Sequence, residues 1–164
     1  MFVADKVLVR VGFDDAKARL GSLARGDGLA SASEAAYSGG VTGLVWPGTP
    51  ESAPAGLRLA KVRSHDLVDS EDCAGLALRW EAIAPDGGLF PALDADIKLT
   101  KTGEQATLVT VTGTYRTAAD FVAAGLDRML LYPVAAATIR ILAHRVADAI
   151  SVLPLAWPDQ EGRP

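Results

Sequence analysis

The chain has 164 residues, of which 49% are hydrophobic and 22% are charged; these proportions are typical of one globular domain and argue against a disordered chain. The formal net charge is −4 without a long basic stripe, so neither nucleic acid nor an anionic membrane surface is an expected partner. Cys73 is the only cysteine, which excludes an intramolecular disulfide and favours a reducing, cytoplasmic location.

The sequence predicts neither a signal peptide nor a membrane span. Residues 1–13 alternate and carry charges, where a signal peptide would need an unbroken apolar run. The longest apolar stretch, residues 120–153, is interrupted by charged side chains such as Arg140 and Asp148, which would be costly in lipid. We therefore expect no membrane insertion.

The first predicted element is a strand over residues 3–13, because apolar side chains recur there in an approximate two-residue period. Asp14 and Asp15 follow as candidate N-cap residues for the first of two short helices, which are separated by a tight turn at residues 26–28. The glycine pair 39–40 is expected to end the second helix.

Six strands are predicted in all. A short strand over residues 41–46 precedes a surface loop over residues 47–56, which cannot lie inside a sheet because it holds three prolines. The connectors between the later strands are short and turn-rich, which indicates an antiparallel meander. The strands of this meander are expected over residues 57–68, 73–84, 89–100 and 105–116.

A long amphipathic helix over residues 120–153 closes the chain. Pro133 lies within it, and a proline removes a backbone donor and clashes with the preceding turn. We therefore expect either a kink near Leu131 or a break into two helices. Residues 1–153 are expected to form a single domain and residues 154–164 a flexible tail.

This order of elements resembles the helix-grip fold of the START-like or SRPBCC superfamily, which includes polyketide cyclases and aromatases. The resemblance covers nearly the whole chain, and three stretches look like uncharacterised bacterial members: LRWEAIAPDGGLFPALDADIKLT, ATLVTVTGTYR and GLDRMLL. It implies an α+β fold in which a curved antiparallel sheet of six or seven strands wraps around the long C-terminal helix. It also implies an interior cavity that holds an apolar ligand.

Strand parity predicts which side chains face that interior. On each of the last three strands the apolar residues share one face and the polar residues share the other, so the apolar faces should look inward. Ordinary core packing is the alternative interpretation for the aromatic residues. The candidate ligand-binding residues are Trp46, Leu78, Trp80, Leu93, Ile97, Val111, Tyr115, Phe121 and Met129. Tyr37 and Arg63 could add further polarity.

Asp94 and Asp96 are the most tempting catalytic candidates, because two carboxylates on one face can divide the roles of general acid and general base. Their parity is opposite to that of Ile97, however, which favours a solvated outer face. A bulge at Pro91 could reverse the phase of only part of the strand.

The remaining reactive residue types are expected to be structural or solvated. His65 and His144 are predicted on the surface, and a structural role is favoured for Cys73 because the acidic run before it would raise its pKa. Two histidines and one cysteine far apart in sequence give no zinc spacing. We therefore assign no catalytic residue and expect neither a metal nor a cofactor.

Three functions remain open. The first is the binding of a hydrophobic small molecule in the cavity. The second is a cyclase-like or aromatase-like enzyme that uses the same pocket, with a tyrosine or arginine to supply a proton or to stabilise an enolate. The third is a protein-interaction module that forms a homodimer through its outer sheet face or an edge strand.

Overall fold

The computed structural model describes residues 1–42, 59–83, 88–116 and 128–152, and of residues 41–42, 89–91 and 128–131 it describes the backbone alone. The elements follow the expected order of one strand, two helices, a run of strands and a final helix. They are β1 (Phe2–Val9), α1 (Phe13–Arg25), α2 (Gly28–Thr42), β2 (Leu59–Ser64), β3 (Val68–Ser70), β4 (Cys73–Ile83), β5 (Leu89–Gly103), β6 (Ala106–Tyr115) and α4 (Arg128–Ser151).

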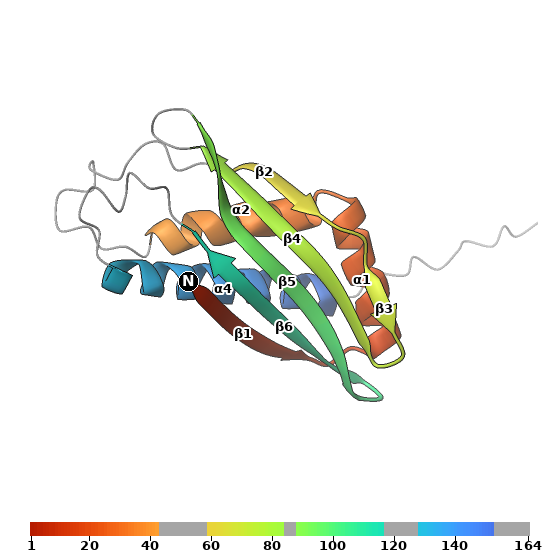
Figure 1. Ribbon diagram of the computed structural model, residues 1–164. Helices are drawn as coiled ribbons and strands as arrows, with labels where there is room; N and C mark the ends of the chain where they lie inside the picture. Colours follow the sequence, from red (N-terminus) through yellow and green to blue (C-terminus); the bar gives the residue numbers. More distant parts are fainter. Residues whose placement is uncertain (43–58, 84–87, 117–127, 153–164) are drawn as a thin grey trace, which may run out of the picture.

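The strands form one six-stranded antiparallel sheet in the order β1-β6-β5-β4-β2, with β3 paired to β4 beside β2. Figure 1 shows the helices packed on one face of this curved sheet, with α4 running behind the strands. A helix buries its apolar side only against another element, so a sheet with helices on one face places the core between the two layers. The predicted α+β helix-grip architecture is confirmed.

Three strand predictions were wrong in detail. The strand expected over residues 3–13 is β1 (Phe2–Val9), and Phe13 belongs to α1. Residues 41 and 42 belong to α2 rather than to a strand over residues 41–46, the rest of which lies outside the described residues. The strand expected over residues 57–68 is two strands, β2 and β3, separated by residues 65–67. The meander from β4 to β6 agrees with its prediction, although β5 continues to Gly103.

Gly39 and Gly40 lie inside α2 instead of ending it, because they are where this helix meets α4. A Cβ atom at Gly39 would lie 2.7 Å from Ile141 Cδ1, and one at Gly40 would lie 1.9 Å from Thr138 Oγ1. Both distances are shorter than real Cβ contacts. The glycine pair therefore allows the backbone of α2 to approach α4 closely, and tertiary contact overrides the helix-ending tendency of glycine.

The start of α1 also differs from its prediction. Gly12, not Asp14 or Asp15, is the N-cap residue, and its carbonyl accepts a hydrogen bond from the Ala16 N–H at 2.9 Å. Phe13 opens the helix and is buried. Asp14 and Asp15 lie in the first turn, where their negative charges are favourable beside the positive end of the helix dipole.

The helix α4 is continuous from Arg128 to Ser151 with Pro133 inside its second turn, so the expected break into two helices does not occur. Ile139, Leu142 and Val146 are fully buried and form part of the stripe that packs toward the sheet and α2. No helix among the described residues is long and apolar enough to span a membrane. The expected tail, residues 154–164, lies outside the described residues.

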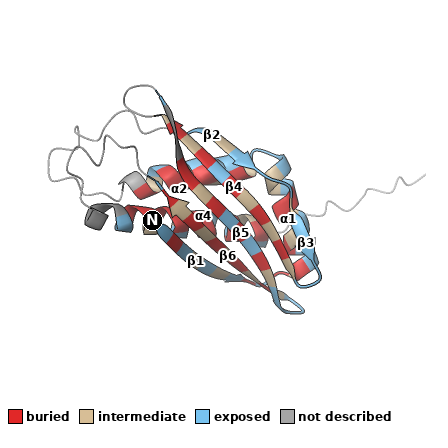
Figure 2. Cartoon of the chain, viewed as in Figure 1, coloured by how far each residue is buried: buried red, intermediate tan, exposed pale blue. Residues whose placement is uncertain are grey.

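The predicted strand parity is confirmed. Buried residues alternate with intermediate or exposed ones along the strands β4 and β6, as Figure 2 shows. The register shifts between Trp80 and Glu81, which pair with Leu93 and Pro91, so that Ala92 is the extra residue of a bulge. Ala92 and Leu93 are both fully buried, and from Leu93 onward β5 follows the expected alternation.

Candidate functional site

Trp80, Leu93 and Tyr115 lie side by side on the inner face of the sheet. Trp80 of β4 pairs with Leu93 of β5, and Leu93 pairs with Tyr115 of β6. Neighbouring strands are about 4.8 Å apart, so this row is roughly 10 Å wide. Trp80 and Leu93 are fully buried and Tyr115 is 8% exposed. The row forms an apolar wall with a phenol at one side and an indole at the other.

Tyr37 of α2 covers this wall from the helix layer. Its ring centroid lies 6.1 Å from that of Trp80 at an interplanar angle of 86°, an edge-to-face contact. Burial raises the pKa of Tyr37 to about 12. Burial, and to a lesser extent the charge of Tyr37, raises the pKa of Tyr115 above its ordinary range. Both hydroxyls therefore stay protonated at neutral pH and are available as hydrogen-bond donors.

We call Tyr37, Trp80, Leu93 and Tyr115 the aromatic cluster. Its members lie toward the C-terminal ends of α2 (Gly28–Thr42), β4 (Cys73–Ile83) and β6 (Ala106–Tyr115), and near the start of β5. In Figure 1 these ends of α2, β4 and β6 lie toward the left and upper left, on the side where α4 begins.

Three polar side-chain atoms in the interior have no hydrogen-bond partner. Within the described residues, Ser33 Oγ, Trp80 Nε1 and Thr138 Oγ1 are buried without a hydrogen-bond partner. Ser33 lies four residues before Tyr37 and so on the same side of α2, and Thr138 faces Gly40 of that helix. A buried polar group without a partner is costly, and native proteins commonly satisfy such groups with water or a ligand.

Charged side chains are not buried in the described part of the chain. The buried polar residues there are Ser33, Thr107 and Thr138, and the Thr107 hydroxyl already donates a hydrogen bond to the Val11 carbonyl at 2.8 Å. An apolar interior with a few neutral donors can orient an uncharged guest, but it offers no counter-charge to an ion.

The remaining ligand candidates fall into three groups. Leu78 lies in the next cross-strand row, beside Ala95 and Gly113, while Ile97 and Val111 pair with each other one row further from the cluster. All three candidates are buried, as parity predicted. Trp46 and Phe121 lie outside the described residues, and of Met129 only the backbone is described, within α4.

The sequence suggested Tyr37 only as an extra source of polarity, yet its ring contacts that of Trp80 edge to face. A weak signal for it was present, because Ser33 and Tyr37 are spaced to share one face of a helix otherwise rich in small residues. Arg63 lies elsewhere: it is exposed and its guanidinium lies 3.5 Å from the Glu81 carboxylate.

The carboxylate pair lies on the outer face, as predicted. Asp94 is held by two arginines, with Arg116 at 3.0 Å and Arg79 at 3.5 Å, and Asp96 is exposed. Both carboxylates are therefore separated from the aromatic cluster by the sheet itself. His65 and His144 are exposed, which confirms their predicted surface positions.

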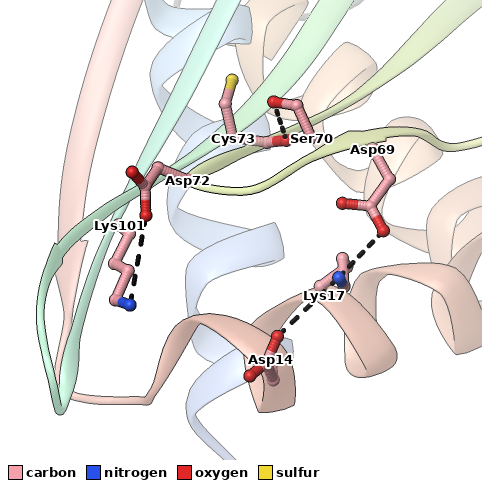
Figure 3. A network of polar contacts seen from close by, with 7 residues as sticks. All are labelled: Asp14, Lys17, Asp69, Ser70, Asp72, Cys73 and Lys101. Carbon is pink, nitrogen blue, oxygen red and sulfur yellow. Dashed lines mark hydrogen bonds and ion pairs between the residues drawn. The ribbon is translucent and has the colours of Figure 1, made fainter.

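Cys73 opens β4 at the far end of the sheet from the aromatic cluster. Figure 3 shows its sulfur pointing away from the neighbouring polar contacts, while its carbonyl accepts a hydrogen bond from Ser70 Oγ at 3.0 Å. Lys17 joins α1 to this corner, with its Nζ 2.9 Å from Asp69 and 3.7 Å from Asp14. The bond to Asp69 raises the pKa of Lys17. These contacts favour a structural role for Cys73 over a role as a reactive thiol.

A hollow of about 400 Å³ opens between the start of α1 and the β5–β6 hairpin. Its wall is mainly backbone and charged side chains, of which three are acidic and one is basic, so it is a solvated groove and not an apolar pocket. The lining residues are Gly12, Phe13, Asp14, Asp15, Lys101, Glu104 and Gln105. Among the described residues no cluster of three or more His, Cys, Asp or Glu side chains could hold a metal ion.

No protein-family model and no curated protein sequence matches the chain. Among solved structures, a conserved protein from Geobacillus kaustophilus is similar over 90% of this chain and 93% of its own, with a TM-score of 0.52 and 16% identity. The chain has a helix-grip fold.

Enzymes are also among the similar structures. The di-domain ARO/CYC BexL from the BE-7585A biosynthetic pathway has a TM-score of 0.40 and 12% identity, over 94% of this chain and 51% of its own. Zhui aromatase/cyclase from Streptomyces sp. R1128 has a TM-score of 0.34 and 12% identity, over 89% of this chain and 93% of its own. At such identities similarity concerns the fold and not the chemistry.

Proposed function

We propose that this chain is a START-like protein that binds a hydrophobic small molecule between the sheet and α4, at the aromatic cluster. The observation that carries the proposal is the group of unpartnered polar atoms in an otherwise apolar interior, namely Ser33 Oγ, Trp80 Nε1 and Thr138 Oγ1. Ligand pockets combine apolar walls with a few polar groups that fix orientation. A well-packed core needs no such groups, and they destabilise it when they have no partner.

In this proposal the side chains have distinct roles. Trp80, Leu93 and Tyr115 form the wall on the sheet, and Tyr37 closes the site from α2. The Tyr115 hydroxyl is the polar handle on this wall. The other proposed ligand contacts are Leu78, Ile97 and Val111 deeper in the sheet, together with Trp46, Phe121 and Met129.

A second candidate is an enzyme that uses the same site, and the two phenols favour it. Burial raises the pKa of both phenols, and Tyr37 adds to the rise at Tyr115, so both side chains are neutral hydrogen-bond donors. Preorganised donors in a dry site can stabilise an enolate oxygen as it forms. Under this alternative Tyr115 contributes to turnover as well as to binding.

Native mass spectrometry of the freshly purified protein tests the proposal. We expect a population heavier than the bare chain that loses a small molecule on denaturation. If no guest co-purifies, a fluorescent apolar probe should still bind and be displaced by aromatic competitors. A protein that carries no guest and binds no apolar probe contradicts the proposed function.

Tyr115→Phe separates the two candidates. For a carrier, loss of one neutral hydrogen bond should weaken binding by roughly fivefold. For an enzyme, removal of a donor to a developing oxyanion should lower kcat by about a hundredfold or more with a smaller change in KM. Asp96→Asn on the exposed outer face is the matched control and should change neither quantity.

A further inference from the structure

The strand β1 forms one edge of the sheet, and its outer side is open. It pairs with β6 alone, and α4 packs against it. Figure 1 shows no other described helix or strand along its second side. Phe2 and Leu8 of this strand are 68% and 61% exposed. A long edge strand with exposed apolar side chains is a template for pairing with a strand of another chain.

The opposite edge of the sheet is built differently. It consists of two short strands, β2 and β3, which are separated by residues 65–67. Lys61 and Arg63 are exposed on it. Short, interrupted and charged edges resist pairing. A second copy of the chain is therefore expected to meet β1 with its own β1, which gives a closed dimer rather than a filament.

The hydrogen bonds from β1 to β6 determine which backbone groups of β1 point toward the open side. The Met1 amine donates to the Tyr115 carbonyl at 3.1 Å, and the Tyr115 N–H donates to the Met1 carbonyl at 2.8 Å. Such hydrogen-bonded pairs recur at every second residue of an antiparallel ladder, and the register of β1 with β6 has no shift. The residues between them direct their N–H and C=O groups away from β6, and they are Phe2, Ala4, Lys6 and Leu8.

These four residues are self-complementary about Asp5. Two copies of β1 related by a twofold axis at Asp5 pair antiparallel, so that Phe2 lies opposite Leu8 of the second copy. Ala4 lies opposite Lys6 of the second copy in the same arrangement. Each of the four residues then forms a hydrogen-bonded pair, and both exposed apolar side chains gain an apolar neighbour on the outer face of the sheet.

A twofold axis at Lys6 is less favourable. It leaves Phe2 opposite Arg10, beyond the end of β1, and separates Phe2 from Leu8 of the second copy. Each arrangement sets one pair of like charges face to face, Asp5 in the first and Lys6 in the second. The hydrogen bonds and the apolar contacts therefore decide in favour of the axis at Asp5.

We propose that two copies of this chain dimerise through their β1 strands, with the twofold axis at Asp5, to form one continuous sheet. This dimer needs no ligand, so the inference stands or fails independently of the proposed function. One strand of 8 residues forms a smaller interface than that of a permanent dimer. The dimer should therefore dissociate on dilution, with a dissociation constant in the micromolar range.

Sedimentation velocity over a range of protein concentrations tests the dimer. Leu8→Lys should weaken it by about tenfold or more, because both contacts between Phe2 and Leu8 are lost and a charge is added at each. Val68→Lys is the matched control, since Val68 is 74% exposed on β3 at the opposite edge. It should leave the dimer unchanged. A wild-type chain that stays monomeric up to millimolar concentration, or equal weakening by the two variants, would overturn the proposal.

Cysteine cross-linking tests the position of the axis. The native thiol is first removed by Cys73→Ser, and Asp5→Cys or Lys6→Cys is then added. At the proposed axis the two copies of residue 5 form a non-hydrogen-bonded pair, whose Cβ atoms are close enough for a disulfide. Mild oxidation should cross-link Asp5→Cys at least fivefold faster than Lys6→Cys. Faster cross-linking of Lys6→Cys would show that the axis at Asp5 is wrong.

Discussion

Gly113 of β6 and Ile139 of α4 approach each other so closely that a Cβ atom at Gly113 would lie 2.8 Å from Ile139 Cδ1. Ile139 is fully buried, so its side chain has little room to move. Because glycine has no side chain, position 113 allows α4 to pack directly against β6. This contact sets the distance between the two layers at the inner edge of the proposed site.

Gly113→Ala should destabilise the fold. The added methyl group overpacks the interface between α4 and the sheet, and such changes typically cost about 1–3 kcal/mol in the free energy of unfolding. Chemical denaturation measures the difference. Gly75→Ala is the matched control on β4, because the nearest atom to its new Cβ would be the Ile97 carbonyl oxygen at 3.9 Å. Equal losses in the two variants would contradict the proposed clash.

Ile139→Val should partly compensate for Gly113→Ala. Valine lacks the Cδ1 atom that meets the new methyl group, and alone this change costs about 0.5–1.5 kcal/mol through lost packing. In the Gly113→Ala background the cost should be smaller or reversed, giving a coupling of about 0.5 kcal/mol or more in a double-mutant cycle. Strict additivity of the two changes would show that the residues do not compete for the same space.

Replacing Asp94 and Asp96 together by Asn should leave ligand binding, and any activity, unchanged. Asp94 is partly exposed and its arginine partners lie on the outer face of the sheet, and exposed ion pairs contribute only about 0–1 kcal/mol each. The measurement is probe affinity alongside thermal denaturation. If the double variant folded but lost binding, the assignment of inner and outer faces would be wrong.

The sequence predicted the sheet wall well, because strand geometry leaves little choice. Successive side chains point to opposite faces, so Trp80, Leu93 and Ile97 had to share one side and Asp94 the other. For helix α2, no comparable rule predicts which side chains face the sheet. Its hydrophobic side is weakly defined by small residues, so the contact of Tyr37 with Trp80 depends on how the helix is held in three dimensions.

The glycine positions show the same limit of prediction from sequence. From sequence alone, Gly39 and Gly40 indicate the end of a helix, and Gly113 is a gap in an apolar row. The structure uses all three for close approach to α4, by contacts with Ile141, Thr138 and Ile139 in turn. Such contacts join segments separated widely along the chain, and no local pattern encodes which partner a glycine will meet.

The fold should lose stability at alkaline pH partly through its buried phenols. Burial raises the pKa of Tyr37 to about 12 in the folded chain, against about 10 in an unfolded one. Above about pH 10 the unfolded chain releases this proton first, so the contribution of Tyr37 is complete below about pH 10 and is lost as the pH rises toward 12. The thermal midpoint of the wild type should therefore fall more steeply between about pH 10 and 12 than that of Tyr37→Phe. Parallel curves for the two proteins would mean that Tyr37 ionises as readily when folded as when unfolded, and the buried position of its hydroxyl would then be wrong.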